Sequence, residues 1–99
     1  MITVQNYVNG TFVSTKETIE DINPATGEII ANIPRSKSDD VEKAVLAADN
    51  AREYWSNLNL EDRRVWLGKI ADVLESRAEE IAKLESLDTG KPIKLARAV

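Results

Sequence analysis

The sequence contains no cysteine and no histidine among its 99 residues, and these two absences exclude most catalytic chemistry. Without cysteine the chain has no disulfide, no thiolate nucleophile and no cysteine-based zinc or iron–sulfur site. Without histidine it lacks the usual base of serine and cysteine hydrolases and the usual transition-metal ligand. The residues present therefore predict a chain that carries out no such reaction by itself.

Basic clusters and long apolar runs are also missing. The 13 Lys and Arg residues are outnumbered by 17 Asp and Glu residues, and a net charge of −4 gives no reason to expect nucleic-acid binding. The uninterrupted apolar runs are too short for a membrane-spanning helix, and the polar start Met1–Asn9 does not resemble a signal peptide. We therefore expect a cytoplasmic chain with no nucleic-acid partner and no membrane partner.

The first third of the chain has the residue types of short strands. Strand formers lie on both sides of Asn9-Gly10, the pair that most readily adopts the positive φ angles of a type I′ turn. Residues Asn6–Val13 therefore predict a tight hairpin.

A second strand pair is expected at Thr18–Ile22 and Glu28–Ile33. In the connection Asn23–Gly27, Pro24 presets the turn and Gly27 can adopt the left-handed conformation that closes it. Pro34 offers no N–H to a sheet and so ends the second strand. Together with the first hairpin, this predicts a β region, residues 1–34, that consists of local antiparallel pairs.

From Ser38 the apolar period changes from two to 3.6, which is typical of helices. Ser38 is a suitable N-cap, and Asp39 and Asp40 add negative charge in the first turn, where the helix dipole favours it. The apolar stripe of this first helix is rich in alanine: Val41, Ala44, Val45, Ala48, Ala51 and Trp55.

A longer helical stretch follows the connection Ser56–Asn59, with Asn59 as its expected cap, and extends to about Asp88. Its apolar positions drift near Glu75-Ser76-Arg77, which predicts a kink or a break there. The side expected to be buried carries Trp66, Leu67, Ile70, Val73, Leu74, Ala78, Ile81, Leu84 and Leu87.

The end of this stretch carries a stop signal and a new start. Gly90 is the expected left-handed residue after the helix, and Pro92 is well placed as the first residue of another helix over Ile93–Val99. A helix of fewer than two turns is unstable alone in water. We therefore expect the sequence to be cut from a longer protein; a short docked terminal helix is the alternative.

Three stretches of the chain resemble the N-terminus of the aldehyde dehydrogenase superfamily: Tyr7–Val13, Ile22–Ile30 and Leu84–Pro92. The resemblance implies an α/β fold, in which residues 1–99 form a single, incomplete N-terminal portion of a Rossmann-like nicotinamide-binding domain, with β-hairpins at 1–34 and helices at 38–99. It also implies a parent enzyme that oxidises an aldehyde to a carboxylate with NAD or NADP, by attack of a cysteine thiolate and hydrolysis of the thioester by glutamate-activated water.

The resemblance does not carry the catalytic machinery into these residues. The nucleophile has to be cysteine, which is absent, and the four glycines (Gly10, Gly27, Gly68 and Gly90) lie too far apart to form a pyrophosphate-binding loop. Ser86–Lys91 likewise lacks the pattern of a phosphate-binding P-loop. No catalytic or cofactor-binding residue is therefore assigned, and the implied partners are the remainder of the enzyme chain, an aldehyde and a homo-oligomer.

Asp88 carries the one specific site hypothesis. Members of the family that act on betaine and amino aldehydes hold a structural K⁺ or Na⁺, and the resemblance places its ligands at Asp88 and at the backbone carbonyl of Asp21 or Ile22. The alternative is an Asp88 carboxylate that accepts local N–H groups or pairs with Lys91.

Two further features stay open in the sequence. The Arg63-Arg64 pair could bind an anion, but a solvated face beside Glu61 and Asp62 is the simpler interpretation. The class of substrate is expected to be a betaine, amino or semialdehyde. The competing function is a stand-alone helical interaction module that docks through the alanine-rich face Val41–Trp55.

Overall fold

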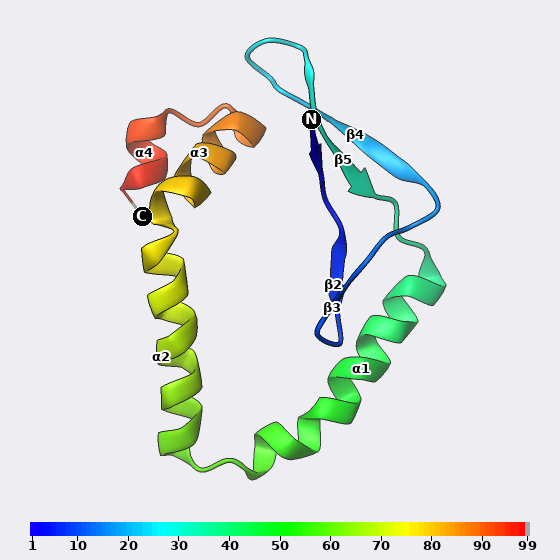
Figure 1. Ribbon diagram of the computed structural model, residues 1–99, viewed down its shortest axis with the longest axis vertical. Coiled ribbons are helices and arrows are strands. Elements are labelled where there is room, and N and C mark those ends of the chain that lie inside the picture. The colour runs from blue at the N-terminus through cyan, green and yellow to red at the C-terminus, as the bar shows by residue number, and fades with distance from the viewer. Residues whose placement is uncertain (99) are drawn as a thin grey trace. The chain divides into compact units, whose positions relative to one another are not determined.

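The structure is a computed structural model and describes residues 1–98 (Figure 1). It forms two compact units, each assembled from two separate stretches of chain. The first unit combines Met1–Asp21 with Ile29–Asn57, and the second combines Ile22–Glu28 with the chain from Leu58 onward. The first unit contains most of the strands and one helix, and the second contains the remaining helices and one turn.

The predicted hairpin is confirmed. Strands β2 (Asn6–Val8) and β3 (Thr11–Val13) pair antiparallel, with Tyr7 opposite Phe12. Asn9 and Gly10 between them have φ angles of 52° and 79°, as a type I′ turn requires. The rings of Tyr7 and Phe12 meet edge to face with their centroids 5.2 Å apart, so a cross-strand aromatic pair supports the register.

A second sheet corrects the expectation of purely local pairing. It contains β1 (Ile2–Thr3), β4 (Thr18–Ile22) and β5 (Ile29–Pro34) in the order β1-β5-β4. The β1 strand is parallel to β5, with Ile2 opposite Ala31. This pairing was missed because a parallel partner lies far along the chain and leaves no turn signal beside a two-residue strand.

The turn between β4 and β5 forms as predicted. The N–H of Gly27 donates to the Asn23 carbonyl at 2.8 Å, and the N–H of Asn23 donates to the Glu28 carbonyl at 2.8 Å. The Asn23 side chain accepts the N–H of Ala25, and Gly27 has a φ of 77°. The β5 strand begins and ends one residue later than expected, with Pro34 as its last residue.

Helix α1 (Ser38–Asn57) has a different cap from the predicted one. The Lys37 carbonyl accepts the N–H of Val41 at 3.1 Å, so Lys37 takes the capping position and Ser38 is already helical. The Asp40 carboxylate reaches back and accepts the N–H of Lys37 at 2.9 Å. The side chain three residues into the helix thus satisfies the end that the Ser38 hydroxyl was expected to satisfy.

The predicted break in the long helical stretch is confirmed. Helices α2 (Leu60–Ser76) and α3 (Ala78–Thr89) meet at Arg77, whose φ of −110° and ψ of 16° leave the helical region. Asn59 caps α2 as expected, since its side chain accepts the N–H of Asp62 at 2.8 Å.

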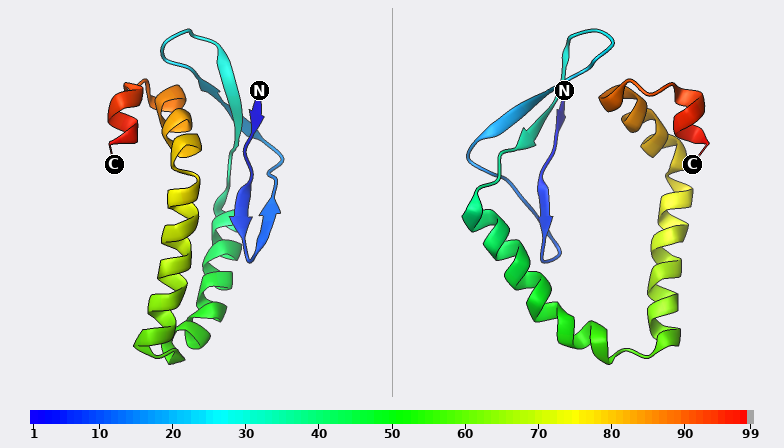
Figure 2. Two further views of the ribbon diagram at one scale, coloured as in Figure 1. Left: turned by 60° about the vertical axis from the view of Figure 1, so that its left-hand side comes forward. Right: turned by 180° about the vertical axis from the view of Figure 1, so that it is seen from behind.

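After α3 the chain turns back on itself. Gly90 ends α3 with a left-handed φ of 77°, and its N–H donates to the Ser86 carbonyl. Pro92 precedes helix α4 (Ile93–Arg97) and does not open it as predicted, because its ψ of 134° is extended. Helices α3 and α4 lie side by side in both views of Figure 2. Val99, the expected last helical residue, lies outside the described residues.

Burial differs most from the sequence prediction. The only buried residues among those described are Ala31, Ala82 and Ala96, whereas the apolar residues of α1 and α2 are largely exposed. The described chain exposes 8154 Å². A compact domain of this mass would expose about 5,600 Å², and two compact globules of half the mass would expose about 6,800 Å² together. The predicted buried sides of the helices are therefore apolar faces that these residues do not cover.

Candidate functional site

The end of α3 is held by a set of local hydrogen bonds. The Ser86 hydroxyl donates to the Lys91 carbonyl at 2.7 Å, and the Thr89 hydroxyl donates to the Glu85 carbonyl at 2.8 Å. The Thr89 oxygen also accepts the N–H of Lys91. These bonds close the helix and turn the chain towards Pro92. Ser86–Lys91 is thus a helix-ending loop, in agreement with the rejection of a phosphate-binding role.

The turn that follows Ile22 contacts this helix end. A Cβ atom placed on Gly90 would lie 3.2 Å from Cγ of Pro24, so the two backbones approach closely at this point. Ile22 is the last residue of β4, and Asp88 is the second-last residue of α3. The structure therefore joins the turn after Ile22 to the helix end after Asp88, although the two segments are far apart in sequence.

The Asp88 side chain is exposed and makes no hydrogen bond or ion pair within residues 1–98. The alternative pairing with Lys91 is not observed, because Lys91 Nζ lies 2.7 Å from Oε1 of Glu85. Nowhere in the described chain do three or more acidic side chains gather as a multivalent metal site would need. A lone carboxylate beside the unpaired carbonyls of a helix C-terminus suits a monovalent cation better than a divalent one.

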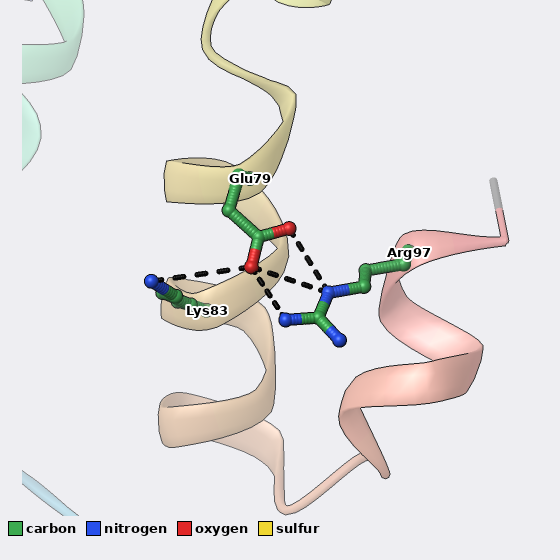
Figure 3. Close-up of polar contacts among 3 residues, drawn as sticks. All are labelled: Glu79, Lys83 and Arg97. Atoms are coloured by element: carbon green, nitrogen blue, oxygen red, sulfur yellow. Dashed lines mark hydrogen bonds and ion pairs between the residues drawn. The ribbon is translucent and has the colours of Figure 1, made fainter.

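A charged cluster between α3 and α4 was not foreseen from the sequence (Figure 3). The Arg97 guanidinium donates to both carboxylate oxygens of Glu79, with distances of 2.6 to 3.2 Å, and Lys83 Nζ lies 3.9 Å from the same carboxylate. The hydrogen bonds from Arg97 lower the pKa of the Glu79 carboxyl. The same contact raises the pKa of Arg97. Because the partners are 18 residues apart, no helical spacing rule could have indicated this pair.

The basic pair near the start of α2 follows the simpler interpretation in part. Arg64 Nη2 lies 2.8 Å from Oε1 of Glu61, three residues earlier on the same helix, and both side chains are mostly exposed. Such a pair contributes a few tenths of a kcal/mol to helix stability. Arg64 is thus part of a solvated face.

Comparison with known proteins identifies the family. The sequence pattern described as the Aldehyde dehydrogenase family matches residues 12–98. The chain is 36% identical over 99 residues to 2-aminomuconic semialdehyde dehydrogenase of Mus musculus, covering 100% of this chain and 20% of that protein. It is 40% identical over 98 residues to the Danio rerio protein of the same name, covering 99% of this chain and 20% of that protein.

Solved structures agree. PnpE in complex with nicotinamide adenine dinucleotide matches 96% of this chain and 20% of its own, with a TM-score of 0.91 and 40% identity. A point mutant of betaine aldehyde dehydrogenase from Staphylococcus aureus, in complex with NAD⁺, matches 95% of this chain and 20% of its own, with a TM-score of 0.89 and 36% identity. The chain thus spans about one fifth of the length of these relatives.

These matches confirm both the resemblance seen in the three sequence stretches and the α/β fold that it implied. Because the family pattern extends over nearly all of the described residues, the chain belongs to the aldehyde dehydrogenase family.

Proposed function

We propose that this chain is the scaffold-forming N-terminal part of an NAD(P)-dependent aldehyde dehydrogenase, which oxidises an aldehyde to a carboxylate. The observation that carries the proposal is the family match over residues 12–98, together with the likeness to an NAD complex at 40% identity. With no cysteine and no clustered glycines, the chain itself supplies neither the nucleophile nor the pyrophosphate loop. Its contribution to the subunit is structural.

The proposed substrate class is an amino, betaine or other semialdehyde. The relatives that support it are named for 2-aminomuconic semialdehyde and betaine aldehyde. Assembly of the parent subunits into a homo-oligomer, a cytoplasmic location and the placement of residues 1–99 within the nicotinamide-binding domain belong to the same proposal. Within the described residues, no helix has the length and apolarity that a membrane span requires.

A chimera tests the proposed function directly. The 99-residue chain would replace the segment of PnpE that it matches, and the purified chimera would be assayed for NADH formation with betaine aldehyde and with a semialdehyde. We expect NAD-dependent oxidation, because the chain then occupies the place that its sequence and fold fit. PnpE that lacks this segment serves as the control. A folded chimera without NADH formation would contradict the proposal.

The same proposal includes a structural K⁺ or Na⁺ held by Asp88 and by the carbonyl of Asp21 or Ile22. Three observations support it: the Asp88 carboxylate has no partner in the described chain, helix-end carbonyls lie beside it, and the turn after Ile22 contacts Gly90. A second negative charge at a helix C-terminus is unfavourable by about 0.3 to 1 kcal/mol without a cation. A bound cation would reverse this and would join the turn to the helix.

Substitution of Asp88 tests the cation site. In the chimera we expect Asp88→Asn to lower the melting temperature in K⁺ and to abolish the difference between K⁺ and choline buffers, while turnover per folded subunit stays unchanged. Glu80→Gln, on the same helix but paired with Arg77, is the matched control. If the K⁺ dependence of the melting temperature survives in Asp88→Asn, the assignment is wrong.

A further inference from the structure

An apolar groove lies where α3 and α4 meet the end of α2. It has a volume of about 590 Å³, and its apolar lining consists of Leu74, Ala78, Ile81, Ala82 and Ala96. The ion pair between Glu79 and Arg97 borders it and fixes α4 against α3 (Figure 3). Because Ala82 and Ala96 are small and buried, the two helices approach closely and the groove has a defined floor.

The apolar side chains of this groove are only partly covered by the chain itself. Leu74 is 54% exposed and Ile81 is 42% exposed. The same side of α2 continues the apolar surface through Ile70 and Leu67, at helical spacings of three and four residues from Leu74. A contiguous apolar surface of this kind marks an interaction site.

The occupant of this surface follows from the length of the relatives. The chain matches one fifth of each relative, so four fifths of the family's polypeptide has no counterpart in it. The matched fifth of PnpE has the same fold, with a TM-score of 0.91, and it belongs to one continuous PnpE chain. The excess of exposed area over the value for compact globules, more than about 1,000 Å², exceeds the roughly 800 Å² that each partner contributes to a standard stable interface.

We propose that the α2–α4 groove and the adjoining face of α2 form a docking surface for the remaining four fifths of an aldehyde dehydrogenase subunit, and that the two polypeptides assemble through it when they are separate chains. This proposal rests on the proposed function, because it takes the partner from the same family. The association is non-covalent and is driven by burial of the apolar groove.

Co-purification tests the proposal. An affinity-tagged copy of the 99-residue chain would be co-expressed with PnpE that lacks the matched segment, and the amount of PnpE recovered on the tag would be measured. We expect recovery of the shortened PnpE. Intact PnpE is the control and should not be recovered, because its own segment already occupies the corresponding position. No recovery of the shortened PnpE, or equal recovery of both forms, would overturn the proposal.

Charge substitutions locate the surface. We expect Leu74→Lys and Ile81→Lys to lower recovery of the shortened PnpE about tenfold or more, since each leaves a charge where an apolar contact should form. Val65→Lys is the matched control and should leave recovery unchanged. Val65 lies nine residues, or about two and a half turns, from Leu74 on the opposite side of α2, and it is 48% exposed. An equal loss in all three variants would overturn the location.

Two outcomes separate this proposal from others. Association of the chain with the shortened PnpE, without any NADH formation by the complex, would contradict the proposed function and leave the docking surface supported. A stable dimer of the chain alone that Leu74→Lys dissociates would show that a second copy occupies the surface, and the docking proposal would be wrong.

Discussion

At the scale of single residues, two separate constraints reserve position 90 for glycine. The φ of Gly90 is 77°, and a Cβ there would lie 3.2 Å from Cγ of Pro24. We expect Gly90→Ala to destabilise the end of α3 by about 1 to 2 kcal/mol, because the left-handed conformation is costly for any residue with a Cβ. The helical signal in far-UV circular dichroism of the 99-residue chain should fall accordingly.

Gly68 provides the opposite case in the same chain. It lies within α2, and a Cβ added there would have no neighbour within 4 Å. Gly68→Ala should therefore raise the helical signal, by an amount that corresponds to about 1 kcal/mol of helix propensity. If both alanine variants changed the signal in the same direction, the conformational argument for Gly90 would be wrong.

At the scale of elements, the attachment of α4 to α3 should depend on pH. The pKa of Glu79 is lowered by hydrogen bonds from Arg97, so the stabilising contact is complete at neutral pH. It is lost as the pH falls below the ordinary glutamate pKa and through the lowered one, because the protonated carboxyl no longer pairs with the guanidinium. An NMR titration should show the α4 amide signals changing over this acidic range.

Two variants check the assignment of this pH dependence. In Glu79→Gln the acidic change of the α4 amides should disappear, and the signals should match the acid form at all pH values. Glu61→Gln, which removes the carboxylate paired with Arg64 on α2, should leave the α4 titration as it is. An α4 titration that is unaltered in Glu79→Gln would rule out the ion pair as its cause.

The start of α2 depends on one side chain. Asn59 accepts the N–H of Asp62 and so satisfies one of the free donors of the first turn. We expect Asn59→Ala to destabilise α2 by about 0.5 to 2 kcal/mol, measured by the loss of helical circular dichroism. Asn57→Ala at the other side of the same connection is the control, because Asn57 ends α1 and caps nothing there.

Most elements were predictable because their signals are local. The Asn9-Gly10 turn, the Asn59 cap and the break at Arg77 each depend on a few neighbouring residues. The β1 strand was not predictable, because its pairing with β5 depends on a distant segment. The periodicity of Leu67, Ile70 and Leu74 correctly indicates an apolar face, but a period does not tell which part of a protein covers that face.

The candidate site depended on resemblance more than on physical signals. Local chemistry alone explains why Gly90 ends a helix, but it gives Asp88 no function beyond a helix-end carboxylate. The structure adds the contact of Pro24 with Gly90, which no spacing rule contains. The clamp of Arg97 on Glu79 was missed for the same reason, since it joins two helices through a turn whose geometry decides the distance.

At the scale of the whole molecule, the isolated chain should be poorly stable. Its buried residues in the described part are three alanines, so little apolar surface is removed from water. We expect binding of a hydrophobic dye, a broad thermal transition and no NADH formation with any aldehyde. The alternative function, a stand-alone interaction module, requires a sharp two-state transition of a monomer, which calorimetry with size-exclusion chromatography would reveal.

The two units are discontinuous in the chain, because the turn Ile22–Glu28 belongs with the helices while the residues on both sides of it belong with the strands. No single peptide bond therefore divides the polypeptide into its two units. A protease that cuts only in the connection after Asn57 would release a first fragment that still carries seven residues of the second unit, and a second fragment that has lost its seat for Gly90. Genes that divide this region at one boundary would inherit the same defect, so recombination is expected to exchange the whole stretch together.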